Sequence, residues 1–153
     1  MKHCAISQIL FSETYTVPAE QTSQRMLGAL PHGKSYSDRL FNVMSNGYLI
    51  AVLESICALE LQLHLDHKEE SIVVASMQCQ HRAPIPPGAF VRITGWVTRV
   101  EERKLTFWVQ ASDEQEIVCE GLICFAIVQR SQVEKKIQRK CDAIARRELF
   151  AGA

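Results

Sequence analysis

The stretch from Ser45 to Leu65, SNGYLIAVLESICALELQLHL, decides the fold of this chain. Ser45 and Asn46 are residue types that favour a helix N-cap, and the polar run over 66–70 ends the apolar pattern. The spacing predicts a helix of about five turns over 48–65. Roughly its first three turns are apolar on nearly every face, so we expect that part to be buried all round and wrapped by other elements.

Runs typical of β-strands lie on both sides of this helix. One covers 10–17, and four more cover 72–80, 89–100, 104–112 and 116–129. Short polar turns between the last four predict antiparallel neighbours. The segment between Pro18 and Met44 is irregular, with a loop at 31–33 and a short helix expected over 36–43. Together these elements predict one α+β domain over 1–153, an antiparallel sheet wrapped around a long helix, which is the hotdog architecture.

The C-terminal segment, residues 131–150, predicts an amphipathic helix. Apolar residues recur there at helical spacing: Val133, Ile137, Cys141, Ile144 and Leu149. From Arg130 onward the segment holds seven Lys and Arg against three acidic residues, a surplus of four positive charges. Such a run is usually a solvated face; the functional alternatives are capture of coenzyme A phosphates and, ranked last, nucleic-acid binding.

Composition excludes several classes of protein. With 153 residues, 47% hydrophobic, 22% charged and a formal net charge of zero, the chain is neither disordered nor strongly basic. Glu54 and Glu60 interrupt the longest apolar tract, so we expect no membrane span, and the N-terminus lacks a signal-peptide pattern. These features predict a cytoplasmic protein. The six cysteines are expected to be reduced thiols, and no Cys or His spacing predicts a metal site.

Two motifs resemble the fluoroacetyl-CoA thioesterase-like family of hotdog proteins. They are VMSNG at 43–47, leading to Leu53 and Glu54, and HRAPIPPG at 81–88. Residues 100–109 and 113–121 extend the resemblance, which covers about 40–130. It implies an acyl-CoA thioesterase with Asn46, Glu54 and His81 as the catalytic residues and no cofactor beyond the coenzyme A of the substrate. It further implies a homodimer, possibly a tetramer, with the active site at the subunit boundary. Expected substrate-binding residues are Gly47, Val74, Pro86 and Gly88.

Two positions depart from the family pattern. The family usually has Thr where this chain has Asn46, and Gly where it has Val74. The first change removes a hydroxyl from the site, and the second narrows or reshapes the acyl pocket. A non-catalytic acyl-CoA binding or sensing module on the same fold is therefore the alternative function.

Each catalytic candidate also has a structural interpretation. Glu54 lies in the most apolar part of the helix, where a carboxylate needs either a catalytic role or an ion pair with an arginine across a dimer interface. His81 is either a catalytic acid–base group or an exposed strand end. Asn46 either orients water and the thioester carbonyl or simply caps the helix. His64 and His67 are expected to be surface residues, and Trp96 and Trp108 packing residues.

Overall fold

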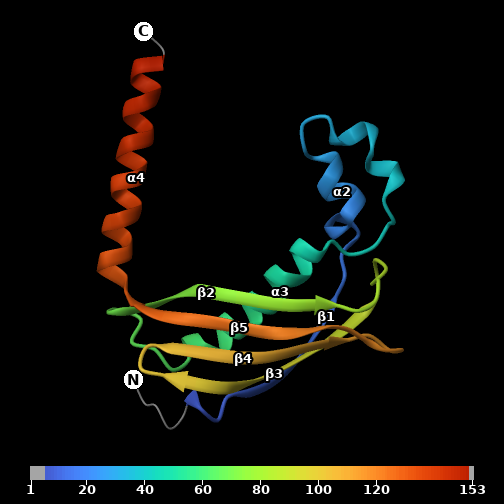
Figure 1. Cartoon of the computed structure of the whole chain (residues 1–153), viewed down its shortest axis with the longest axis horizontal. Coiled ribbons are helices and arrows are strands. Elements are labelled where there is room, and N and C mark those ends of the chain that lie inside the picture. Colours follow the sequence, from blue (N-terminus) through green and yellow to red (C-terminus); the bar gives the residue numbers. More distant parts are fainter. Residues whose placement is uncertain (1–5, 152–153) are drawn as a thin grey trace.

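The computed structural model describes the backbone of residues 6–151 and the side chains of residues 6–147. Its sheet has five strands in the order β1-β3-β4-β5-β2, all antiparallel, and α3 lies across one face (Figure 1). The predicted α+β hotdog architecture is confirmed. The main elements are β1 (Leu10–Thr16), α3 (Asn46–Gln62), β2 (Glu70–His81), β3 (Phe90–Glu101), β4 (Lys104–Ser112), β5 (Ile117–Gln129) and α4 (Arg130–Ala151).

One face of α3 forms the core with the sheet. Its buried residues follow helical spacing: Leu49, Leu53, Cys57 and Leu61. The sheet contributes Phe107 and Phe125, whose rings meet edge to face with centroids 6.0 Å apart. The opposite face of α3 is open: within its first three turns Tyr48, Ala51 and Ser55 are exposed, and further on Leu59 is 67% exposed. The prediction of all-round burial is therefore wrong for the single chain, because one five-stranded sheet covers only one side of the helix.

The segment between β1 and α3 differs from the prediction. Its only described α-helix is α2 (Ser23–Gly28), and the helix expected over 36–43 is reduced to a single 3₁₀ turn at Ser37–Arg39. Thr22 caps α2 through its side chain, which accepts a hydrogen bond from the Arg25 N–H at 3.4 Å. Two further 3₁₀ turns, Ala19–Gln21 and Gly33–Ser35, complete the segment.

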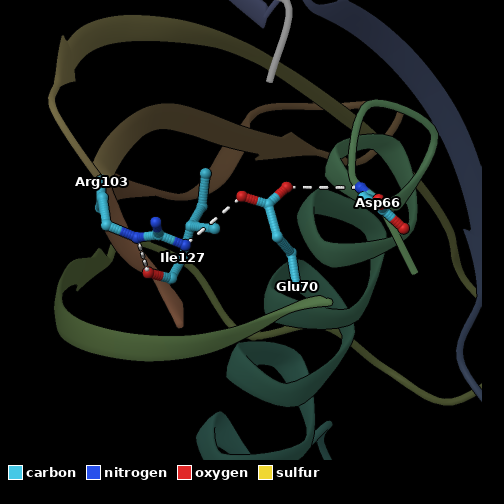
Figure 2. Close-up of polar contacts among 4 residues, drawn as sticks. All are labelled: Asp66, Glu70, Arg103 and Ile127. Atoms are coloured by element: carbon cyan, nitrogen blue, oxygen red, sulfur yellow. Dashed lines mark hydrogen bonds and ion pairs between the residues drawn. The ribbon is translucent and has the colours of Figure 1, made fainter. Parts of the chain in front are cut away.

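A polar cluster fixes the end of the sheet where β2 begins (Figure 2). Glu70 accepts from the Arg103 guanidinium at 3.3 Å and from the Asp66 N–H at 3.3 Å. The Arg103 Nε donates to the Ile127 carbonyl at 3.0 Å. Next to it, the Arg130 N–H donates to the Glu69 carbonyl at 3.0 Å. The α3–β2 loop, the β3–β4 turn and the start of α4 are thus tied together.

Gly95 in β3 provides room for an aromatic ring. It pairs with Phe11 of β1, and a Cβ at position 95 would lie 2.4 Å from the Phe11 Cζ. Phe11 is buried and packs at 6.3 Å from the ring of Phe107, so it has little freedom to move. The absence of a side chain at Gly95 is therefore a packing requirement of this part of the sheet.

We expect Gly95→Ala to destabilise the protein by about 1–3 kcal/mol, because overpacking a filled core forces side chains off their rotamers. The measurement is urea unfolding of the wild type and the variant. The control is the same substitution in a Phe11→Leu background, where the added methyl group no longer meets an aromatic ring and should cost much less. An equal cost in both backgrounds would contradict the assignment of the effect to Phe11.

Candidate active site

The start of α3 is held against the loop between β2 and β3. The Met44 N–H donates to the Ile85 carbonyl at 2.7 Å, and the Ser45 N–H donates to the Gln21 carbonyl at 2.9 Å. Thr22 and Met44 form an isolated antiparallel bridge. These backbone contacts bring the first residue of α3 to the end of β2, although the two positions are 35 residues apart in sequence.

Asn46 and His81 line the same hollow within one chain. The hollow has a volume of about 280 Å³. The start of α3 and the residues before it form one wall, and the β2–β3 loop forms the other. The lining residues are Val43, Met44, Asn46, Leu49, His81, Arg82, Ala83, Pro84 and Ile85. The structure thus brings together two of the three predicted catalytic residues.

The N-terminus of α3, whose first residue Asn46 lines this hollow, leaves backbone hydrogen-bond donors free. Of the two N-cap candidates, Ser45 occupies the N-cap position and Asn46 is the first residue of the helix, so the alternative in which Asn46 caps the helix is wrong. The Ser45 hydroxyl makes no capping bond and instead donates to the Met26 Sδ at 2.9 Å. Within the described chain, the N–H groups of Asn46, Gly47 and Tyr48 have no acceptor. Free N–H groups and the positive end of the helix dipole favour a negatively charged oxygen there.

His81 is the last residue of β2 and is half-buried rather than exposed. Its Nε2 atom is buried and has no hydrogen-bond partner among the described residues. Burial lowers the pKa of this imidazole below its ordinary value of 6.5, because desolvation disfavours the charged ring. His81 therefore presents a neutral imidazole with an unused ring nitrogen, a combination suited to accepting a proton from a bound molecule.

Glu54 lies two turns further along α3 and is half-buried. It does not line the hollow that contains Asn46 and His81. Its carboxylate has no hydrogen bond or ion pair with any described residue, so an arginine partner within the described chain is excluded. Among the described residues of the single chain, Glu54 is a carboxylate on an apolar helix without a partner.

The four expected substrate-binding residues lie outside the hollow. Gly47 is exposed on the first turn of α3, and Val74 is half-buried beside the bulge in β2. Pro86 and Gly88 line a different hollow of about 540 Å³ next to the β4–β5 turn. Gly88 has a φ of 86°, the conformation that the turn before β3 requires.

Sequence reasoning missed the residues that complete the hollow. Met44 and Leu49 are buried, and Ile85 meets them from the β2–β3 loop. Arg82 forms an ion pair with Glu120 of β5. Met44, Leu49 and Ile85 are apolar, but this property does not show that they lie together. Their two segments are distant in sequence and are joined by the hydrogen bond between Met44 and Ile85.

The described cysteines are free thiols, as predicted. Burial raises the pKa of Cys57 to about 12 and that of Cys119 to about 12. Both thiols are therefore protonated at neutral pH and are poor nucleophiles. The described chain also contains no group of three or more His, Cys, Asp or Glu side chains that could hold a metal ion, and none of its helices is long and apolar enough to cross a membrane.

Comparison with solved structures identifies the class of fold. The chain matches a crystal structure of the fluoroacetyl-CoA thioesterase with a TM-score of 0.77 and 22% identity, covering 87% of this chain and 95% of that one. It matches a hot-dog-like protein from Thermanaerovibrio acidaminovorans with a TM-score of 0.75 and 17% identity, covering 92% and 97%. These likenesses, together with the five-stranded sheet and α3, define a hotdog-fold protein.

Sequence comparison identifies the family within that class. The model of the fluoroacetyl-CoA-specific thioesterase family matches residues 32–131. The fluoroacetyl-CoA thioesterase of Streptantibioticus cattleyicolor is 24% identical over 133 residues, which cover 87% of this chain and 92% of that protein. The chain belongs to the fluoroacetyl-CoA-specific thioesterase family, as the motifs around Asn46 and His81 predicted. The expectation of a thioesterase enzyme is confirmed at the level of the family.

Proposed function

We propose that the protein hydrolyses an acyl-CoA thioester to the free acid and coenzyme A, using a water molecule activated by Glu54 and His81. The observation that carries this proposal is the hollow lined both by Asn46, at the free N–H end of α3, and by His81, whose buried Nε2 has no partner among the described residues. Acyl transfer to water needs a base for the water and donors for the carbonyl oxygen; the end of α3 supplies the donors, and Glu54 together with His81 supplies the base. No metal or other cofactor has a role in the proposed reaction.

Each residue has a defined task in the proposed reaction. The thioester carbonyl oxygen lies at the start of α3, where free N–H groups and the Asn46 amide stabilise the negative charge of the tetrahedral intermediate. Glu54 accepts a proton from the water molecule as the water oxygen attacks the carbonyl carbon. Neutral His81 then takes this proton from Glu54 and delivers it to the sulfur as the C–S bond breaks, so that coenzyme A leaves as a thiol and Glu54 is ionised again.

Glu54 requires a second subunit in this proposal. It lies outside the hollow of its own chain, on a flank of α3 about 140° around the helix from the exposed Leu59. A homodimer that covers this flank would enclose Glu54 and complete the site at the boundary. The two-fold axis makes both sites of such a dimer equivalent.

The test is release of free thiol from a panel of short, branched and aromatic acyl-CoAs, followed with a thiol-reactive dye. We expect steady release of coenzyme A from at least one member of the panel. Calorimetry on the same panel separates the alternative, a non-catalytic binding module, since that protein would bind acyl-CoA without releasing thiol. Binding without turnover would therefore reject the proposed hydrolysis.

We expect Asn46→Thr, which introduces the residue usual in the family, to lower turnover by roughly tenfold, because an amide donor at the developing oxyanion is lost. The measurement is kcat for the best acyl-CoA of the panel. Asn42→Thr, on the exposed segment before α3, is the matched control and should leave kcat unchanged. A rise in kcat on Asn46→Thr would favour a binding module that has lost catalysis.

A further inference from the structure

Helix α4 leaves the domain without packing on it. It covers Arg130–Ala151, of which all but the first two residues lie beyond the 32–131 match to the family, and it extends away from the end of the sheet (Figure 1). From Ser131 to Arg147 every residue is exposed except Val133, which is half-buried. An isolated helix of this length is marginal in water, so a surface that it contacts is expected to contribute to its stability.

The base of α4 is anchored at the start of β2. The Arg130 N–H donates to the Glu69 carbonyl at 3.0 Å, and the Arg130 Nε donates to the His67 carbonyl at 3.1 Å. The cluster of Figure 2 fixes the same end of the sheet through Glu70 and Arg103. His81 is at the other end of β2, roughly 35 Å away at the rise of an extended strand. The hollow of a chain is therefore remote from the base of its own α4.

The exposed surface of α4 is strongly basic. Lys136, Arg139 and Lys140 line a shallow groove of about 520 Å³ together with Val133, Ile137 and Ala143. Lys136 and Lys140 make no hydrogen bond or ion pair with any residue that the structure describes. Unpaired cations around a groove suit an anionic ligand. The substrate class proposed above carries such anions, a pyrophosphate and a 3′-phosphate at its nucleotide end.

The edge of the sheet next to α4 favours a second copy of the chain. β2 is an edge strand of 12 residues, and no charged residue separates Glu70 from His81 along it. Natural edge strands are usually protected by charges, so this edge is open to pairing. The opposite edge, β1, has seven residues and carries Glu13. Leu59 on α3 and Leu63 directly after it are additional apolar surface that a partner would cover.

If the β2 strands of two chains pair around a two-fold axis, the base of α4 of one chain comes close to the hollow of the other. In an antiparallel pair, the start of one strand lies beside the end of the other. The partner's β2 start, and with it the base of the partner's α4, then lies near His81 of this chain. We propose that α4 of each subunit binds the nucleotide phosphates of acyl-CoA held at the Asn46–His81 hollow of its partner. This inference rests on the proposed function and specifies how that substrate is recognised.

Neutralising the groove tests the role of α4. We expect Lys136→Gln/Arg139→Gln/Lys140→Gln to raise KM for acyl-CoA about tenfold, with kcat within twofold, since the variant loses charge-assisted contacts to phosphate but no reacting group. The same acyl group on N-acetylcysteamine, which lacks the nucleotide, should show unchanged kinetics. The matched control neutralises three exposed cations of β3 and β4, Arg92, Arg99 and Lys104, and should leave both substrates unaffected.

A mixed refolding experiment tests the partner's contribution. The groove variant, which keeps His81, is unfolded and refolded together with His81→Ala protein, which keeps its basic α4. In heterodimers only the groove-variant chain supplies His81. Groove-variant homodimers in the mixture keep the raised KM. A second kinetic component with the wild-type KM for acyl-CoA therefore shows that α4 acts on the partner's site, whereas a single raised KM places α4 on its own site and overturns the inference.

The remaining outcomes separate this inference from the proposed function. Calorimetry with coenzyme A itself gives a readout that does not depend on turnover, and the groove variant should bind it about tenfold more weakly. Wild-type hydrolysis of both thioesters with unchanged KM in the groove variant would overturn only the role of α4. A wild type that binds coenzyme A but hydrolyses neither thioester would reject the proposed function. A sedimentation mass near 17.3 kDa would reject the second copy.

Discussion

Glu54→Gln is expected to lower kcat/KM for acyl-CoA by at least about a hundredfold, the lower end of the cost of removing a general base. Gln keeps the shape of the side chain but cannot accept a proton from water. Glu54 has no partner among the described residues, so the substitution breaks no ion pair there, and stability should change little. The measurement is steady-state thiol release, with thermal unfolding alongside it.

Glu60→Gln is the matched control for this experiment. Glu60 is also half-buried on α3, but it lies near the opposite end of the helix from the hollow. We expect its replacement to leave kcat/KM within a few-fold of wild type. Wild-type turnover of the Glu54→Gln protein would move the catalytic base to another residue, and equal losses in both variants would point to a structural effect on the helix.

His81→Ala is expected to cause a loss of similar size, about a hundredfold in kcat/KM. Because His81 and Glu54 act on the same water in the proposed reaction, the double variant should lose less than the two single losses combined. Fully additive losses would show that the two residues do not cooperate. Thermal unfolding of each single variant checks that the loss does not arise from misfolding.

The pH profile gives a second readout of His81. Burial lowers the pKa of its imidazole below 6.5, so the neutral form persists to a more acidic pH than in water. The acid limb of kcat/KM attributable to His81 should therefore lie below pH 6.5. The unfolded state binds this proton more readily, so His81 also makes the fold less stable as pH falls below its ordinary pKa. An acid limb above 6.5 would contradict a desolvated, neutral His81.

Mixing the two inactive proteins shows which chain supplies each residue. Asn46 and His81 line one hollow of the same chain, whereas Glu54 lies outside it. After Glu54→Gln and His81→Ala proteins are refolded together, we expect partial recovery of activity, because Glu54 and His81 of different chains would complete one site per heterodimer. No recovery, with heterodimers shown to form, would place both residues in the same subunit's part of the site.

Local sequence pattern was sufficient for the regular elements of this protein. Helix α3 and the five strands appear within a few residues of their predicted bounds, and the C-terminal helix was expected over 131–150 and covers Arg130–Ala151. Such elements repeat an apolar period of their own, so their type follows from neighbouring residues. The motifs around Asn46 and His81 likewise predicted the family, because they are contiguous in the chain.

Tertiary structure alone decided how those elements meet. No local pattern showed that Met44 would pair with Ile85 and so bring Asn46 beside His81, or that α2 would replace the helix expected over 36–43. The same holds for α3, whose apolar residues predicted burial on every side, while its outer face is open in the single chain. The apolar period of a sequence predicts which residues share one face of a helix or strand. What covers that face depends on contacts between distant segments and, for Glu54 and α4, on the second copy proposed here.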